Sequence, residues 1–405
     1  MRPVPGRRAP RLLFTVNDAA FFVSHRLPIA RAAAAAGYDV HVATAPGAAV
    51  SEIVSAGLIH HRVPLSRSGL NPGAEIRTFL ALATLFRRLR PDLVHLVTIK
   101  PVIYGGLAAR LTRCPAVVSA VPGLGSLFVA RGVSAAVLRA GATFAYRLAL
   151  GHRHGRVIFQ NPDDRDWFIG RGLVKRDRWV LIKGSGVDMA RFAPMPEPPE
   201  SLGPPVVVLP ARMLRDKGVA EFVAAARALR ARGVAARFVL VGASDPGNPT
   251  AIPESDLRAW HAEGTVEWHG PAADMPAVLA GAHIVCLPSY REGLPKSLIE
   301  AAACARPIVA TDVPGCREIA RHGENALLVP PRDAAALAEA LARLIAEPAL
   351  RRRLGARGRA IAEAEFALDS VIDQTLALYR TLLDPHSHIV AARFPASCPH
   401  EREPS

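Results

Sequence analysis

Short apolar runs and segments with helical spacing alternate along the chain, and this alternation occurs twice. In the first half we expect strands over residues 11–16, 38–44, 92–97, 116–121 and 156–160. Segments with apolar residues at helical spacing lie between them, at 21–36 and 74–89. Buried strands that alternate with helices are typical of a parallel, doubly wound α/β sheet.

A Pro-rich stretch over residues 194–205 separates the two halves and is expected to be a semi-rigid linker. Beyond it we expect a helix over 219–231 and strands over 205–211, 236–242, 266–268 and 284–287. The chain is therefore expected to form two tandem doubly wound domains, 1–193 and 206–365. A ligand cleft should lie between them at the carboxyl ends of the strands.

Helical spacing resumes at residue 333 and continues to about residue 383. The tail, 384–405, is rich in Pro, His and Ser, and we expect it to be disordered. No run of eighteen or more apolar residues occurs, and polar residues interrupt the only N-terminal stretch that resembles an export signal. We expect a cytoplasmic protein. The five cysteines, which lack CxxC spacing, favour a reducing compartment over disulfides or a zinc site.

The net charge of +15 is placed unevenly along the chain. The first 200 residues hold 27 Lys and Arg against 12 Asp and Glu, whereas the remainder holds 23 of each. A basic half suggests attraction to a polyanion or to an anionic membrane surface. The alternative is a set of solvated arginines from an Arg-rich genome. We expect no nucleic-acid partner, and the sequence does not indicate the oligomeric state.

One segment, residues 291–300, combines two carboxylates with a loop-to-helix junction. Pro295 suits the first turn of a helix, so Glu292 is expected in the approach loop and Glu300 inside the helix. Eight helical residues rise about 12 Å and return to nearly the same face. Free backbone N–H groups and the positive end of the helix dipole lie between the carboxylates. Such a site suits a nucleotide-sugar, which has hydroxyls at both ends and phosphates in the middle.

The same segment resembles the E-x7-E motif of the retaining glycosyltransferases of family 4 (glycosyl transferases group 1), which have the GT-B fold. The flanking runs at 286–289, 306–315 and 323–330 are similar to the family's C-terminal pattern. The resemblance implies two Rossmann-like domains that face each other across a cleft, with a helix over 366–383 crossing back to the N-terminal domain. It also implies that Glu292 accepts hydroxyls of the donor sugar and Glu300 holds the ribose. Further donor contacts are expected from Gly293, Leu294 and Ser297.

A second pair of residues resembles the family's R-x4-K motif. Arg212 ends a predicted strand, and Lys217 precedes the next helix. A guanidinium, an ammonium and a helix N-terminus can converge on phosphate oxygens. The resemblance implies that Arg212 and Lys217 hold the donor diphosphate and stabilise its charge as it leaves. The Asp164-Arg-Asp166 string reads as a helix start with acidic capping, so we expect neither a metal nor another cofactor.

Acceptor-side candidates follow predicted strands of the first half. His25 and Arg26 face the cleft in the family's layout, and Lys100 offers a charge for an acceptor phosphate. His95 lies within a predicted strand, where a buried structural histidine is the more common alternative. The sequences of these loops resemble those of a bacterial subgroup of the family, whose members build surface polysaccharides or lipid-linked oligosaccharides.

A helix around residues 133–148 carries one apolar face flanked by Arg139 and Arg147. That face consists of Val133, Val137, Phe144 and Leu148. The helix is a candidate for contact with a membrane, although a face turned toward the protein core is the more common explanation.

The expected activity is the transfer of a hexose or N-acetylhexosamine from a nucleotide-sugar to a lipid-linked saccharide, at the cytoplasmic face of the plasma membrane. UDP is the expected carrier by family frequency alone. One alternative is a nucleotide-sugar 2-epimerase of the same fold, which would need no acceptor. Another is a non-catalytic homologue that binds nucleotide-sugars. A dehydrogenase is disfavoured because G-x-G-x-x-G is missing after the first predicted strand.

Overall fold

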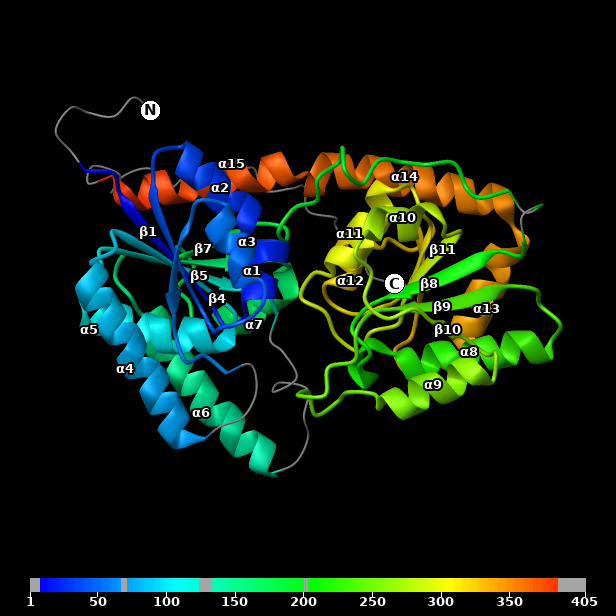
Figure 1. The fold of residues 1–405 in the computed structure, drawn as a ribbon, viewed down its shortest axis with the longest axis horizontal. Coiled ribbons are helices and arrows are strands. Elements are labelled where there is room, and N and C mark those ends of the chain that lie inside the picture. The colour runs from blue at the N-terminus through cyan, green and yellow to red at the C-terminus, as the bar shows by residue number, and fades with distance from the viewer. Residues whose placement is uncertain (1–7, 67–70, 124–132, 200, 202, 385–405) are drawn as a thin grey trace.

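The computed structural model describes residues 8–66, 71–123, 133–199, 201 and 203–384, which form two α/β domains side by side (Figure 1). Each domain is built on one parallel sheet. The strand orders are β3-β2-β1-β4-β5-β6-β7 in the first and β10-β9-β8-β11-β12-β13 in the second. The order reverses beside β1 and again beside β8, so a crevice forms at the carboxyl ends of these strands. The prediction of two doubly wound domains is confirmed, and the arrangement is that of the GT-B fold.

The first sheet comprises β1 (Arg11–Val16), β2 (Asp39–Thr44), β3 (Ile59–Arg62), β4 (Leu93–Val97), β5 (Ala116–Val121), β6 (Gly155–Phe159) and β7 (Trp179–Leu181). Its helices are α1 (Ala19–His25), α2 (Leu27–Ala35), α3 (Val50–Ser55), α4 (Pro72–Leu89), the π-helical turn Pro101–Gly105, α5 (Gly106–Leu111), α6 (Val133–Leu150) and α7 (Pro162–Gly170).

The second sheet comprises β8 (Val206–Pro210), β9 (Arg237–Val241), β10 (Glu267–Trp268), β11 (Ile284–Leu287), β12 (Ile308–Thr311) and β13 (Ala326–Val329). Its helices are the 3-10 turn Arg215–Lys217, α8 (Val219–Ala231), α9 (Glu254–Ala262), α10 (Met275–Ala280), α11 (Lys296–Ala303), α12 (Cys316–Ile319), α13 (Ala334–Ala346) and α14 (Pro348–Phe366), followed by α15 (Leu368–Leu383).

The first helical segment differs from its prediction. A single helix over 21–36 is wrong, because α1 ends at His25 and α2 begins at Leu27. Arg26, at the junction, has φ −129° and ψ −18°, outside the helical region. Pro28 occupies the first turn of α2, where its missing N–H costs no hydrogen bond. Four strands were not predicted, namely β3, β7, β12 and β13. β3 is a partly exposed edge strand that contains two histidines, and β7 has only three residues.

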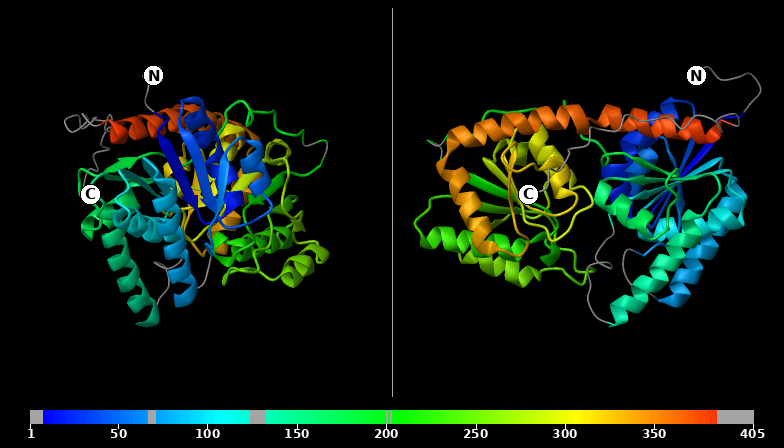
Figure 2. Two further views of the ribbon diagram at one scale, coloured as in Figure 1. Left: turned by 60° about the vertical axis from the view of Figure 1, so that its left-hand side comes forward. Right: turned by 180° about the vertical axis from the view of Figure 1, so that it is seen from behind.

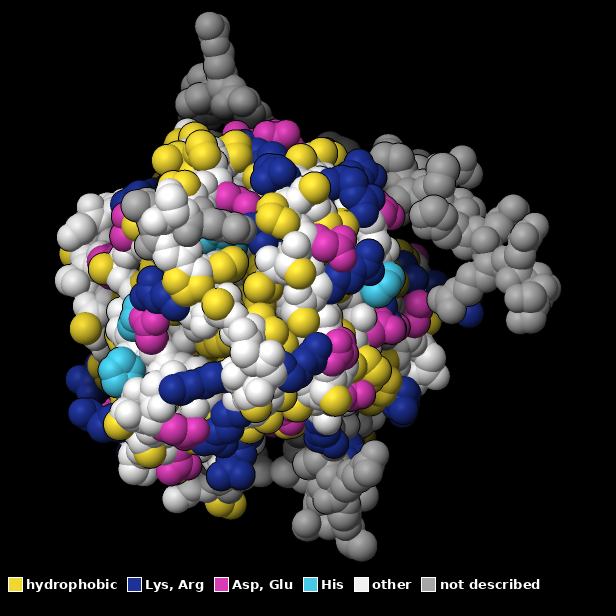
Figure 3. Space-filling model, turned by 90° about the vertical axis from the view of Figure 1, so that its right-hand side faces the viewer, with side chains coloured by type: hydrophobic (Ala, Val, Ile, Leu, Met, Phe, Trp, Pro, Cys, Tyr) yellow, Lys and Arg dark blue, Asp and Glu magenta, His cyan; other side chains and the backbone are white. Residues whose placement is uncertain are grey.

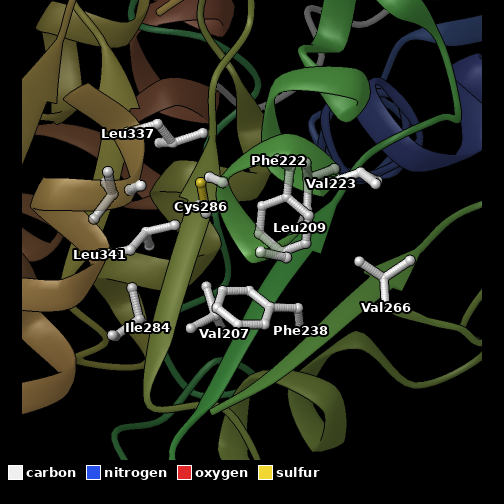
Figure 4. Close-up of a cluster of buried hydrophobic side chains, with 14 of the residues drawn as sticks. Val207, Leu209, Phe222, Val223, Phe238, Val266, Ile284, Cys286, Leu337 and Leu341 are labelled. Atoms are coloured by element: carbon white, nitrogen blue, oxygen red, sulfur yellow. The ribbon is translucent and has the colours of Figure 1, made fainter. Parts of the chain in front are cut away.

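Each sheet is covered by helices on both faces, and the buried side chains come mainly from strand interiors. In the second domain, Phe222 of α8 packs edge-to-face on Phe238 of β9, with ring centroids 5.7 Å apart. Figure 4 shows this cluster, which lies between the second sheet and the helices α8 and α13. Leu209, Ile284 and Cys286 of the strands are fully buried there. Continuous apolar strands of this kind are typical of a parallel sheet that is buried on both faces.

The last two helices run along one side of the whole molecule, α14 beside the second domain and α15 beside the first (Figures 1 and 2). Val371, Leu376 and Tyr379 of α15 belong to the same buried cluster as the β1 side chains. Where α14 passes to α15, Leu368 N–H donates to the Val187 carbonyl, and Val187 N–H donates to the Phe366 carbonyl, each at 3.0 Å. The two passages of the chain between the domains therefore lie side by side.

The first of these two passages, which leads from the first domain to the second, begins before residue 193, where the first domain was expected to end. Val187 and Phe192 are already buried in a cluster of the second domain. The Pro-rich segment that follows is tied to this domain, since Arg306 donates to the Pro196 carbonyl and Arg351 contacts Glu197 at 3.4 Å. Basic and acidic side chains are interspersed over the outer end of the second domain (Figure 3). No helix in the described ranges is long and apolar enough to cross a membrane.

Candidate active site

A cleft of about 1160 Å³ opens between the two domains, where the loops after the central strands meet. From the first domain it is lined by side chains around α1 and by the residues that follow β4, β5 and β6. From the second domain it is lined by the segments that follow β8 and β11. The residues predicted for the donor that line it are Arg212, Lys217, Glu292, Gly293, Leu294 and Ser297.

The loop after β11 carries the first carboxylate of the E-x7-E segment. Pro295 is the N-cap of α11, so Glu292 lies in the loop and Glu300 lies within the helix. The Glu292 side chain is only 10% exposed and accepts hydrogen bonds from Lys217 Nζ at 2.5 Å and Ser289 Oγ at 2.7 Å. These donors hold the Glu292 carboxylate at the cleft, where it can accept hydrogen bonds from hydroxyl groups.

Lys217 and Arg212 approach this loop from the segment after β8. Lys217 lies in the 3-10 turn that ends at Gly218, whose φ is +71°. A Cβ atom on Gly218 would lie 2.1 Å from the Pro288 carbonyl oxygen, so glycine allows the two segments to touch. The Arg212 guanidinium is half exposed and contacts Asp245 at 2.5 Å. Two cations therefore border the part of the cleft that precedes α8.

Glu300 is placed differently from Glu292. Its side chain is 12% exposed and lies 3.4 Å from Lys296 Nζ, and it does not line the cleft as the other donor candidates do. Burial raises the pKa of this carboxyl, and the Lys296 charge opposes the shift. Lys296 Nζ also donates to the Ser24 carbonyl of the first domain at 2.8 Å, so this lysine bridges the two sides of the cleft.

His25 is the acceptor-side candidate that lines the cleft. Its ring stacks on Phe21 at 4.1 Å between centroids, and its Nδ1 lies 2.7 Å from Ser24 Oγ. Burial, together with the smaller effects of the Lys296 and Arg26 charges, lowers the pKa of His25 to about 3. The imidazole is therefore neutral at pH 7 and is a weak base.

The other three acceptor-side candidates do not line the cleft. This corrects the expected position of Arg26, whereas the burial of His95 agrees with the structural alternative. Arg26 turns into the protein at the α1–α2 junction, is 3% exposed and donates to the His25 carbonyl. His95 is buried on β4, where its Nδ1 lies 2.5 Å from the Tyr379 hydroxyl of α15. Lys100 pairs with Glu75 at 2.6 Å. Each of these groups has a structural environment that the strand and helix pattern alone did not reveal.

Three residues that meet at the domain interface were not among the predicted site residues, namely Asn161, Asp164 and Arg291. Asn161 caps α7, with its Oδ1 accepting from Asp164 N–H at 2.7 Å. The predicted helix start is confirmed, but the cap is an amide side chain and the acidic residues lie in the first turn. Asn161 Nδ2 also donates to the Gly293 carbonyl, and Asp164 accepts from Arg291. The position of Asn161 and Asp164 shortly after β6, at the carboxyl edge of the sheet, is the signal that could have identified them.

Comparisons with known proteins agree with this geometry. The model "Glycosyl transferases group 1" matches residues 204–347, and the model "Glycosyl transferase 4-like" matches residues 11–161. A relative from Campylobacter jejuni, N,N'-diacetylbacillosaminyl-diphospho-undecaprenol alpha-1,3-N-acetylgalactosaminyltransferase, is 29% identical over 91% of this chain and 98% of its own length.

Two solved structures share the architecture. Sucrose-phosphate synthase from Thermosynechococcus elongatus has a TM-score of 0.76 and 23% identity over 93% of this chain and 99% of its own. Anabaena Alr3699/HepE, solved with UDP and glucose, has a TM-score of 0.73 and 19% identity over 92% of this chain and 100% of its own. Since the family models match both halves and the whole chain has the GT-B fold, the protein belongs to the group 1, family-4-like glycosyltransferases.

Proposed function

We propose that the protein transfers a hexose or an N-acetylhexosamine from a UDP-sugar to a lipid-linked saccharide, with retention at the anomeric carbon and without a metal ion. The observation that carries this proposal is the convergence of Arg212, Lys217 and Glu292 on one interdomain cleft. Cations suited to a diphosphate and a carboxylate suited to sugar hydroxyls border the same space. A structure of the same fold solved with UDP and glucose supports the donor class.

In this proposal Arg212 and Lys217 hold the diphosphate and take up the charge that develops on it as the sugar leaves. Glu292 orients the sugar through its hydroxyls, with Lys217 and Ser289 holding the carboxylate in place. Backbone N–H groups of the first turn of α11 face the phosphates, and those of Gly293 and Leu294 face the sugar. Glu300 contributes the ribose contact once the Lys296 side chain, which lies 3.4 Å from it, moves aside as the donor binds.

Retention requires that the new bond forms on the face from which the diphosphate departs. The C1–O bond to phosphate breaks, the acceptor oxygen bonds to C1, and the acceptor proton passes to a phosphate oxygen. No side-chain base is needed on that face. His25, which is close to the acceptor side, is a weak base because its pKa is about 3. The alpha linkage in the name of the Campylobacter relative supports retention from an α-linked donor.

The acceptor is proposed to be a saccharide on a diphosphate lipid. The Campylobacter relative is named for such an acceptor, a diphospho-undecaprenol. In this chain, α4 and α6 project from the first domain on the side opposite to α15 (Figures 1 and 2). Exposed apolar side chains occur on both helices, namely Ile76, Leu80, Phe144 and Leu148. Side chains of Val133 and Val137 lie outside the described residues. Together with the basic charge of this half, these helices would face an anionic membrane.

Membrane contact is tested by co-sedimentation with vesicles that contain an anionic lipid, at low salt. The double variant Leu80→Ser, Phe144→Ser should lower the bound fraction several-fold, since each buried methylene contributes about 0.8 kcal/mol. Met195→Ser, which removes an equally exposed apolar side chain from the interdomain segment, is the matched control. Equal binding by both variants would exclude these helices as the contact.

The donor proposal is tested by thermal shifts with UDP, GDP, ADP and their common sugar conjugates, with and without EDTA. A ligand at a hundred times its Kd should add about 2.7 kcal/mol to the free energy of unfolding. A selective shift that persists in EDTA, followed by transfer to an undecaprenyl-diphosphate saccharide, is the expected result. Donor conversion without an acceptor would indicate an epimerase, and no shift with any nucleotide would indicate a homologue that lacks donor binding.

A further inference from the structure

The first turn of α7 contacts the donor loop of the opposite domain. Asn161 Nδ2 donates to the Gly293 carbonyl at 2.7 Å, and Arg291 Nη2 donates to Asp164 Oδ1 at 2.8 Å. A weaker contact follows on the same turn, where Asp163 lies 3.7 Å from Arg317 of α12. The first domain thus holds the loop on both sides of Glu292 without touching Glu292 itself in these contacts.

The two contacting side chains are buried and mutually bonded. Asn161 is fully buried and the Asp164 side chain is 1% exposed. Asn161 Nδ2 also donates to Asp164 Oδ2 at 3.0 Å, and Asn161 Oδ1 accepts from Asp164 N–H at 2.7 Å. Every polar atom of the Asn161 amide group is therefore engaged. A buried amide whose polar atoms are all bonded holds one geometry, because any displacement leaves a polar group without a partner.

The backbone approach at this point is too close for any side chain. A Cβ atom on Gly293 would lie 1.5 Å from the Pro122 carbonyl oxygen, which follows β5 in the first domain. A Cβ atom on Gly123 would in turn lie 3.1 Å from Gly293 Cα. The loop that carries Glu292 is therefore seated directly against the first domain, and only glycine at 293 permits this contact.

The bond from Asn161 also orients the next amide group. The carbonyl of Gly293 and the N–H of Leu294 belong to one peptide unit, and the described chain contains no cis peptide bonds. In a planar trans unit these two groups point in opposite directions. Fixing the carbonyl toward Asn161 therefore fixes the direction of the Leu294 N–H, in a residue that lines the cleft.

The groups proposed for the diphosphate do not depend on this contact. Arg212 and Lys217 both follow β8 of the second domain, and Arg212 pairs with Asp245 of the same domain. Binding of a nucleoside diphosphate should therefore need the second domain alone. The sugar-binding loop, by contrast, is positioned from the first domain.

We propose that Asn161 and Asp164 are positioning residues for the donor sugar, which act through Gly293 and Arg291 to hold the loop that carries Glu292. The sugar pocket is complete only when the first domain is seated on this loop, whereas the diphosphate site exists without it. This inference rests on the proposed nucleotide-sugar donor, and it deepens that proposal by assigning sugar recognition to both domains.

The test compares Asn161→Ser with wild type. Serine is a good helix N-cap, so the α7 cap is retained, but its shorter side chain carries no amide to reach Gly293. Asp166→Asn is the control, because Asp166 lies on the same helix, is exposed and pairs with its neighbour Arg165. Three quantities are measured for each protein: the Kd for UDP, kcat and KM for transfer from the UDP-sugar, and the melting temperature.

We expect Asn161→Ser to lower kcat/KM for the UDP-sugar about tenfold or more, the scale of one lost positioning hydrogen bond in a catalytic site. Its Kd for UDP should stay within about twofold of wild type, and Asp166→Asn should match wild type in all three quantities. Asp164→Asn, which keeps the shape of the side chain, should show the same split between transfer and UDP binding if Asn161→Ser does not fold.

Transfer by Asn161→Ser equal to that by Asp166→Asn would overturn the inference while leaving the proposed function intact. A parallel loss of UDP affinity and melting temperature would also overturn it, because that pattern belongs to a structural role. Wild-type protein that neither binds UDP nor uses a UDP-sugar would instead overturn the proposed donor.

Discussion

Lys217 Nζ lies 2.5 Å from Glu292 Oε1, which joins the segment after β8 to the loop after β11. Both side chains are largely buried, with 22% and 10% of their surfaces exposed. The pair connects the phosphate side of the cleft to the sugar side. A cation in this position can pass between carboxylate and phosphate partners without leaving the site.

Replacement of Lys217 should therefore affect both halves of the donor. Lys217→Met removes the cation and leaves the buried Glu292 carboxylate with Ser289 as its remaining described donor. We expect kcat/KM for transfer to fall about 100- to 1000-fold, as for the loss of one group that stabilises transition-state charge. Lys217→Arg should restore little, since the fork of a guanidinium does not replace a point charge. Lys175→Met, at an exposed position, is the control in steady-state assays. Activity within twofold of wild type in Lys217→Met would contradict this role.

Arg212 should contribute mainly to nucleotide affinity. Its side chain is 47% exposed and pairs with Asp245 of the same domain, whose side chain is 20% exposed. Arg212→Ala should weaken UDP binding about tenfold, the scale of one charge-assisted contact to phosphate, and should reduce the salt dependence of binding. Arg227→Ala is a matched control, since Arg227 is 49% exposed and pairs with Glu263 away from the cleft. Calorimetric titration that gives the same affinity and salt dependence for the two variants would remove Arg212 from the diphosphate site.

The hydrogen bond between His95 and Tyr379 should affect stability rather than catalysis. It joins β4 to α15 and lies in the interior of the first domain. Tyr379→Phe leaves His95 Nδ1 buried without this partner, which should lower the free energy of unfolding by about 1–3 kcal/mol. Tyr38→Phe, at a neighbouring ring 6.1 Å away, should change it by about 0.5 kcal/mol or less. Denaturant unfolding measures both, and an unchanged KM for the acceptor is expected. A raised acceptor KM with unchanged stability in Tyr379→Phe would indicate that His95 belongs to the acceptor site.

The lowered pKa of His25 predicts how the stability of the protein depends on pH. Burial lowers the pKa of His25 to about 3, whereas an unfolded chain titrates near the ordinary value of 6.5. Between these values the unfolded state binds the proton and the folded state does not, so stability falls as the pH is lowered through this window. Glu300, whose pKa is raised by burial, acts in the opposite sense, so variants must be compared with wild type. His25→Gln should show a shallower decrease in melting temperature between pH 6.5 and pH 4. Parallel curves for the two proteins would contradict the shift.

Much of the architecture could be predicted because its signals are local. Apolar runs such as Leu12–Val16 alternate with segments of helical spacing. Each run indicates by its own composition that it forms a buried strand of a parallel sheet. The relation between Glu292 and Glu300 is also local, since one loop and one helix join them. Spacing along a single segment was therefore sufficient to place one carboxylate in the loop and the other in the helix.

The break at Arg26 and the roles of His95 and Lys100 could not be predicted in this way. His95 is one of five buried residues in β4, and the strand pattern does not say which helix supplies its partner. The partner is Tyr379, 284 residues later, on a helix that returns from the other domain. Lys100 likewise pairs with Glu75 of α4. Only the packing of α4 on the first domain brings these two side chains together.

The sequence by itself determined the two parallel sheets, the loop-to-helix carboxylate pair and the cations after β8, because local periodicity and short spacings carry that information. Only the tertiary structure decided which groups meet across the cleft, as Asn161 meets Gly293 and Lys296 meets Ser24. Such hydrogen bonds depend on how the two domains are seated on each other. That seating is decided by close backbone contact at Gly293 and by the packing of α15, and neither leaves a periodic signal in the chain.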